Sequence, residues 1–204
     1  MNGSSFNFNI RTAALTTCLV VFSLGTALGP SEASAVVSTV NCGAKPVSHI
    51  DLADCNLSNA NLRGARLVGV DFVGVNLTGA DLRGANLTSA DLANAKLPHA
   101  DLARANLTKS NFRNANLAGA NLTGANLTNA NLEGKTSSSE WAASELGANL
   151  AGANLAGANL TNANLDEVNL ASANLTDATV TGAYMAGANM TGANKTGLKG
   201  QPFD

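Results

Sequence analysis

The amino-acid sequence predicts an all-β solenoid, in which the chain winds through short stacked coils. Three observations lead to this prediction. A large apolar residue, mostly leucine, recurs at every fifth position over residues 52–132 and again over residues 150–190. A small residue stands two positions before it, and a polar residue stands between the two. Of the 26 units, 21 have leucine at the large position, 20 have alanine at the small position and 22 have asparagine or aspartate between them.

A spacing of five residues fits neither an α-helix nor a continuous strand. On an α-helix each residue advances by about 100°, so leucines five apart scatter around the axis and form no stripe. On a strand, side chains alternate between two faces, so an odd spacing sends successive leucines to opposite faces. The pattern therefore requires the chain to turn between units.

Each unit reads as one short side of a coil. The sequence apolar-polar-apolar is a strand-like step with two side chains pointing in and one pointing out. The next two positions hold mostly small or polar residues, as a corner requires. One small and one large inward residue per side fill a narrow interior, and four such sides close a coil of 20 residues. Stacked coils, about 4.8 Å apart, can then pair through backbone hydrogen bonds.

The tandem motif A-[ND]-L-x-G resembles that of the pentapeptide repeat family. The resemblance implies a right-handed quadrilateral β-helix with the large and the small residue of each unit inside. Applied to residues 50–195, it predicts about 6.5 coils. The chain is most similar in type to signal-bearing members of the family, which abound in cyanobacteria and whose biochemical role is mostly unknown.

The first 35 residues have the pattern of a secretory signal peptide. Arg11 precedes an uncharged apolar stretch at residues 12–29, and residues 33–35, Ala-Ser-Ala, form an A-x-A cleavage site. An uncleaved membrane anchor is the alternative, since the apolar stretch is at the lower length limit for spanning a bilayer. We expect cleavage, export to a periplasm or thylakoid lumen, and no stable membrane insertion of the mature chain.

The two ends of the solenoid are predicted to be covered. Residues 36–49 would form an N-terminal cap, and residues 196–204 a C-terminal tail over the other edge. Cys42 and Cys55 remain after export to an oxidising compartment, so a disulfide between them is expected. The alternative is that Cys55 is a small core residue, as its position in the repeat allows.

One insert, at residues 133–147, interrupts the repeat with 13 residues more than the five-residue spacing needs. Ser137 and Glu140 resemble a capping box, which predicts an inserted loop or a short helix over residues 138–146. The insert contains the single tryptophan of the chain, Trp141. Glu140, Trp141 and Leu146 are therefore candidate partner-binding residues. The alternative is a local cap that folds back on the rod.

Outward carboxylates should form two columns, with Asp51, Asp71 and Asp91 on one side and Asp81 and Asp101 two sides away. Like charges in a column could bind a cation, but solvated carboxylates are the simpler interpretation. The triplet Asn-Leu-Thr recurs in register at three places, which raises an ice- or ligand-binding face as an alternative function: residues 86–88, 106–108 and 126–128.

No set of nucleophile, base and orienting residue is evident, so we expect no enzymatic activity and no cofactor. His49 and His99 lack partners at metal-ligand spacing, so no metal is expected either. The net charge of −2 provides no basic footprint for nucleic acid.

The composition and the resemblance leave three functions open. The first is an exported structural or protein-binding scaffold with an unidentified protein partner. The second is a DNA mimic that binds gyrase, as quinolone-resistance members of the family do, but those members are cytoplasmic and strongly acidic. The third is a ligand- or ice-binding surface.

The signal pattern predicts that the mature protein begins at Val36. N-terminal sequencing of protein from its native host should therefore start at this residue. Recovery of the protein from the cytoplasm with Met1 intact would contradict both the predicted export and the oxidising environment.

Overall fold

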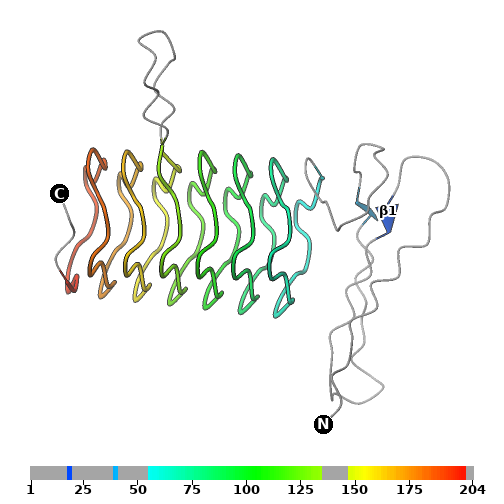
Figure 1. Cartoon of the computed structure of the whole chain (residues 1–204), viewed down its shortest axis with the longest axis horizontal. Coiled ribbons are helices and arrows are strands. Elements are labelled where there is room, and N and C mark those ends of the chain that lie inside the picture. Colours follow the sequence, from blue (N-terminus) through cyan, green and yellow to red (C-terminus); the bar gives the residue numbers. More distant parts are fainter. Residues whose placement is uncertain (1–17, 20–38, 41–54, 135–146, 201–204) are drawn as a thin grey trace, which may run out of the picture.

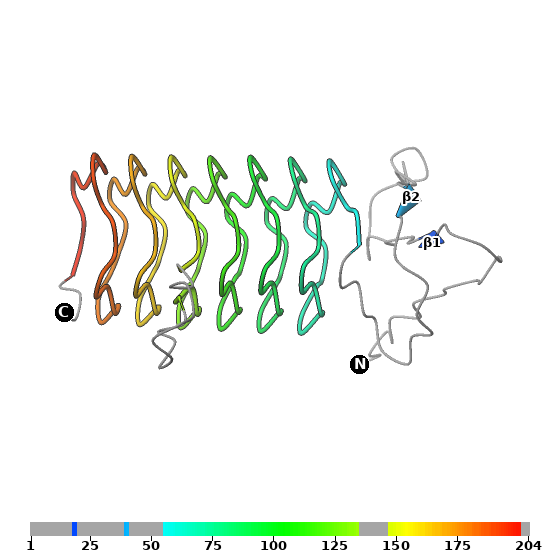
Figure 2. The ribbon, with the colours of Figure 1, turned by 90° about the horizontal axis from the view of Figure 1, so that it is seen from above.

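A computed structural model describes residues 18–19, 39–40, 55–134 and 147–200. The last two ranges form one elongated rod of stacked four-sided coils, seen from the side in Figure 1 and from above in Figure 2. No helix occurs within the described ranges. The rod is the right-handed quadrilateral β-helix that the repeat predicts.

Two short strands lie earlier in the sequence than the rod. Strand β1, Cys18–Leu19, pairs antiparallel with strand β2, Thr39–Val40. In this register Cys18 is opposite Val40 and Leu19 is opposite Thr39. Cys18 lies inside the predicted signal peptide, so this pairing belongs to the unprocessed chain.

Parallel bridges join each coil of the rod to the next. The paired residues are 20 apart, as in Asn56 with Asn76, which confirms four five-residue sides per coil. Across the insert the separation becomes 33, as in Asn116 with Asn149. The difference equals the 13 extra residues counted from the repeat, so the coil resumes in the same register on both sides of the insert.

Backbone hydrogen bonds run continuously between the coils. The Leu102 N–H donates to the Asn121 carbonyl at 2.7 Å, and the Asn121 N–H donates back to the Ala100 carbonyl at 2.9 Å. At the corner the Arg104 N–H donates to the Thr123 carbonyl at 2.9 Å. Each side thus satisfies its backbone through its neighbours along the rod, which explains how three-residue strands persist.

Each corner is a tight turn that explains the last position of the motif. The Ala60 N–H donates to the Leu57 carbonyl at 3.0 Å, three residues back. The third residue of the turn, Asn59, has φ of 58°, and Gly64 at the next corner has φ of 64°. A type II turn requires positive φ at this position, which glycine and asparagine adopt most readily. Glycine and asparagine are the commonest residues at this position, although others such as Arg104 and Glu167 adopt the same positive φ.

The polar residue of each unit is hydrogen-bonded rather than simply outward-facing. The Asn56 Oδ1 accepts the Ser58 N–H at 3.1 Å and the Asn76 Nδ2 donates to the same oxygen at 3.2 Å. The first bond closes the corner and the second ties two coils together. Aspartate can replace the acceptor, as when the Asn111 Nδ2 donates to the Asp91 Oδ1 at 2.9 Å. This double use explains the near-invariable Asn or Asp.

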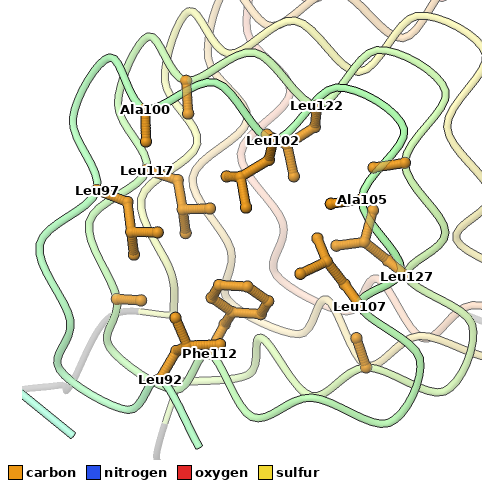
Figure 3. Packing of buried hydrophobic residues seen from close by; sticks show 14 of the residues in the cluster. Leu92, Leu97, Ala100, Leu102, Ala105, Leu107, Phe112, Leu117, Leu122 and Leu127 are labelled. Atoms are coloured by element: carbon orange, nitrogen blue, oxygen red, sulfur yellow. The ribbon is translucent and has the colours of Figure 1, made fainter. Parts of the chain in front are cut away.

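The interior consists of four columns of large apolar side chains with alanines between them. Figure 3 shows the interior of the rod, with two labelled large residues from successive coils on each of the four sides. All of them have 0% exposure, and the pairs are Leu92 and Phe112, Leu97 and Leu117, Leu102 and Leu122, and Leu107 and Leu127. The expected inward placement of the large and small residues is confirmed.

Ser110 is the one polar residue buried among the described positions. It occupies a position that alanine fills in most units. Its hydroxyl donates to the Leu107 carbonyl at 2.6 Å, so the buried oxygen does not lose its hydrogen bond. The substitution for alanine is therefore compatible with the core.

The C-terminal tail prediction is wrong for residues 196–199. Thr179 forms a parallel bridge with Lys199, and the Lys199 N–H donates to the Ala178 carbonyl at 2.8 Å. Leu198 packs against the core as part of this last side. Backbone pairing thus continues beyond the last recognisable unit, because the ladder depends on register rather than on leucine. Phe203 and the predicted cap at residues 36–49 lie outside the described residues.

Replacement of Leu122 by alanine should lower the free energy of unfolding by about 2–5 kcal/mol, because it leaves a cavity in a fully buried column. The matched control is Asn116→Ala, which removes hydrogen bonds at the surface of the same coil. Its cost should be about 1 kcal/mol. Chemical denaturation followed by circular dichroism measures both values, and equal costs would reject the assigned inward and outward positions.

Candidate protein-binding surface

The insert leaves and rejoins the rod at one corner that remains closed beneath it. The Ala148 N–H donates to the Leu132 carbonyl at 2.9 Å. This is the same bond that closes an ordinary corner, although 15 residues separate its two partners in the sequence instead of two. The rod therefore completes its turn without using residues 135–146, which lie outside the described residues.

Two buried glycines anchor the ends of the insert on the following coil. The Gly134 N–H donates to the Asp166 carbonyl and the Gly147 N–H to the Glu167 carbonyl, both at 3.1 Å. A Cβ on Gly147 would lie 2.9 Å from both of these carbonyl oxygens, so no larger residue fits there without displacing backbone. This close approach provides a reason for glycine at residue 147 within the described chain.

The three predicted partner-binding residues lie outside the described residues. Glu140, Trp141 and Leu146 therefore remain predictions. The structure describes the base of the insert, which is formed by the residues on either side of the segment 135–146.

The base of the insert is held by polar contacts of Glu133. Its carboxylate lies 3.7 Å from the Arg113 guanidinium and accepts a hydrogen bond from the Asn164 Nδ2 at 2.5 Å. Its backbone N–H donates to the Asn131 Oδ1 at 3.1 Å. These contacts join three successive coils, so the chain is firmly placed up to the point where the insert departs.

Tyr184 is a surface residue near this base that the sequence analysis did not select. Bridges connect Asn131 to Asn164 and Asn164 to Tyr184, so Tyr184 lies on the side of the rod that ends at the insert. Its side chain is 51% exposed, and only it and Val68 are exposed large hydrophobic residues in the described chain. The sequence did contain one indication of Tyr184, because tyrosine replaces the usual Asn or Asp at the polar position of the repeat.

Charge is distributed unevenly along the described rod. Residues 55–113 contain seven basic and four acidic side chains, which corresponds to a net charge of +3. The described residues from 114 to 200 contain two basic residues, Lys195 and Lys199, and four acidic residues, which corresponds to a net charge of −2: Glu133, Asp166, Glu167 and Asp177. The half of the rod that carries the insert is therefore acidic.

The second predicted carboxylate column is partly neutralised by an arginine. The Arg83 guanidinium donates to both carboxylate oxygens of Asp81, at 2.8 and 2.6 Å, and its Nε lies 3.6 Å from Asp101. The hydrogen bond from Arg83 is the largest influence on Asp81 and lowers the pKa of its carboxyl. Within the described residues, no three His, Cys, Asp or Glu side chains group as metal ligands.

The threonines of the Asn-Leu-Thr triplets are aligned in one column but bonded within the rod. The Thr88 hydroxyl donates to the Asn86 Oδ1 at 2.6 Å, and Thr128 donates to Asn126 at the same distance. Because the hydroxyl hydrogens are directed to asparagine, they are not available to order water or a ligand. This geometry does not favour the ice-binding alternative.

Cys55 is buried, with 1% exposure, at the beginning of the described rod. It is disulfide-bonded, but the described side chains do not include its partner. The sequence left two interpretations of Cys55 open, a core residue and a disulfide partner. The structure shows that Cys55 is both buried and disulfide-bonded. The pairing with Cys42 remains a prediction.

The described geometry is that of a repetitive four-sided rod whose repeat is interrupted once, between Gly134 and Gly147. The profile of the pentapeptide repeats family matches the chain in eight copies, over residues 50–88, 85–124, 95–134, 147–182 and 169–194. The protein therefore belongs to the pentapeptide repeat family, as the motif indicated.

Solved structures of this family are similar to the chain. Rfr23 from the cyanobacterium Cyanothece 51142 is 27% identical, with 74% of this chain and 91% of that chain covered and a TM-score of 0.29. A pentapeptide repeat protein from the Arabidopsis thaliana thylakoid lumen is 32% identical over 59% and 64% of the two chains, with a TM-score of 0.22. The fluoroquinolone resistance protein QnrB1 is 17% identical over 74% and 79%, with a TM-score of 0.28.

A comparison with curated protein sequences gives no match. Among the described residues, no helix has the length and apolar character needed to cross a membrane.

The disulfide of Cys55 is predicted to join it to Cys42 in the mature protein. Cys18 would be removed with the signal peptide, which leaves Cys42 as the remaining partner within the chain. Non-reducing peptide mapping of protein from the exported fraction should yield a linked Cys42–Cys55 peptide. Detection of free thiols at both positions, or a disulfide between two molecules, would contradict the prediction.

Proposed function

We propose that the protein is a non-enzymatic, exported scaffold that binds a protein partner through the insert at residues 133–147. The observation that carries this proposal is the corner hydrogen bond between Ala148 and Leu132, which is kept although the insert intervenes. A segment that the rod does not need in order to close has no evident structural reason to be present. A binding role would provide one.

The repeated faces support the same location for specificity. Successive coils present similar Asn, Thr and Ala side chains, so a partner would find few features that distinguish one position along a face from another. The insert breaks this regularity and contributes Trp141. Aromatic residues on exposed loops frequently anchor interfaces. Tyr184, on the adjoining side of the rod, would extend the same surface.

The charge of this half of the rod indicates the partner's chemistry. Glu133, Asp166 and Glu167 lie around the base of the insert, and the insert itself contains Glu140, Glu145 and one basic residue, Lys135. A basic protein surface would complement these carboxylates. Because exposed charges are screened by salt, binding of such a partner should weaken as ionic strength rises.

Deletion of residues 135–147 is expected to abolish partner binding while the rod stays folded. It joins Gly134 to Ala148 and creates the sequence Leu-Glu-Gly-Ala, with glycine at the turn position that needs positive φ. The partner would first be captured from the exported fraction by the intact protein and identified by mass spectrometry. Its purified form would then be titrated against the intact and deleted proteins by calorimetry.

Two point variants serve as matched tests within the full-length chain. Trp141→Ala should weaken binding at least about tenfold if the indole is an anchor. Thr78→Ala, on a repeated face far along the rod from the insert, should leave binding unchanged. Retained binding in the deletion would place the contact on a repeated face, and a loss of the β signal in circular dichroism would show that the insert is a structural cap.

A further inference from the structure

The inward columns of the rod do not all end in the same way. One column runs through leucine at every coil and then changes to lysine at the last: Leu62, Leu82, Leu102, Leu122, Leu155, Leu175 and Lys195. The leucines are buried to 2% exposure or less, whereas Lys195 is exposed. The bridge between Asn174 and Asn194 fixes the register, so Lys195, the next residue, occupies the inward position above Leu175.

The last coil presents an open β edge in the described part of the chain. The N–H of Leu175 donates to the carbonyl of Asn194 at 2.8 Å, but the N–H of Lys195 has no equivalent acceptor on a following coil. The same is true of Met190, whose side chain is only partly buried. Unpaired backbone groups beside apolar side chains form a template on which another chain can pair.

A second copy of the rod is the occupant whose geometry matches this edge. The second copy has the same described edge at residues 185–200, so the two edges could pair through their unpaired backbone groups.

Lys195 would oppose such stacking. A coil placed over it would enclose the ammonium group at the end of an apolar column, directly above Leu175. Lys195 forms no ion pair among the described residues, so the buried charge would be uncompensated. With the edge open, the aliphatic stem can cover Leu175 while the ammonium group stays in water.

The neighbouring column also lacks a residue on which a further coil could pack. Gly200 stands at its inward position, above Val180, with φ of 88°. A Cβ there would lie 2.7 Å from the Thr181 backbone nitrogen and 2.8 Å from its Cα. The last coil therefore offers a charge in one column and no side chain in the next.

We propose that Lys195 opposes the stacking of a second copy of the chain on the described edge formed by residues 185–200. This role is independent of the proposed binding function of the insert. It assigns to one inward lysine the task that polar terminal repeats perform in other solenoids.

The test compares two lysine-to-leucine substitutions in the same coil. Lys195→Leu at the inward position should produce association that rises with concentration, with a weight-average mass about twofold or more above that of the wild type. Lys199→Leu makes the same chemical change at an outward position and should keep the wild-type mass. Light scattering coupled to size-exclusion chromatography measures all three proteins over a concentration series.

Two additional variants complete the test: Lys195→Gln and a chain that lacks residues 201–204. Lys195→Gln, which keeps a polar group at the edge, should retain the wild-type mass, and circular dichroism would verify that each variant keeps the β signal. The proposal fails if Lys195→Leu has the wild-type mass at every concentration, or if Lys199→Leu associates equally. It also fails if only removal of residues 201–204 causes association, because the block would then belong to that segment.

Discussion

The narrow interior of the coil is the constraint on which the rest of the structure depends. Each side has room for one large and one small inward side chain, and neighbouring coils lie only about 4.8 Å apart. Leucine and alanine meet this limit with minimal exposure, and backbone hydrogen bonds between coils hold the sides at that spacing. The outward asparagines reinforce the same spacing, since they bond both to their own corner and to the adjacent coil.

These restrictions on the residues of each repeat limit where a surface that recognises one particular partner can form. A coil that must repeat its inward residues and its hydrogen-bonding asparagines retains only a few variable positions, chiefly those of the corners. The rod compensates by placing a large variation at one corner, between Gly134 and Gly147, where the closing bond of the turn is unaffected. Stability and recognition are thereby separated, because the segment proposed to bind the partner is outside the ladder that holds the fold.

The surface around the insert was less predictable than the core. Trp141 could be selected because an aromatic residue in a break of the repeat is unusual. Tyr184 required the bridges to Asn164 and Asn131 before its position near the insert became apparent, since it lies 50 positions after Gly134 in the sequence. The contact between Arg83 and Asp81 also needed the structure, because two outward residues on one side can point together or apart.

The sequence by itself determined the fold, the coil length and the number of inserted residues. It could do so because five-residue periodicity, small inward residues and turn-forming corners are local requirements that every unit repeats. Only the tertiary structure decided how the ends of the insert are anchored on Asp166 and Glu167. It also showed that backbone pairing between coils continues to Lys199. These features depend on contacts between coils 20 or more residues apart, where backbone register rather than side-chain type determines which groups meet.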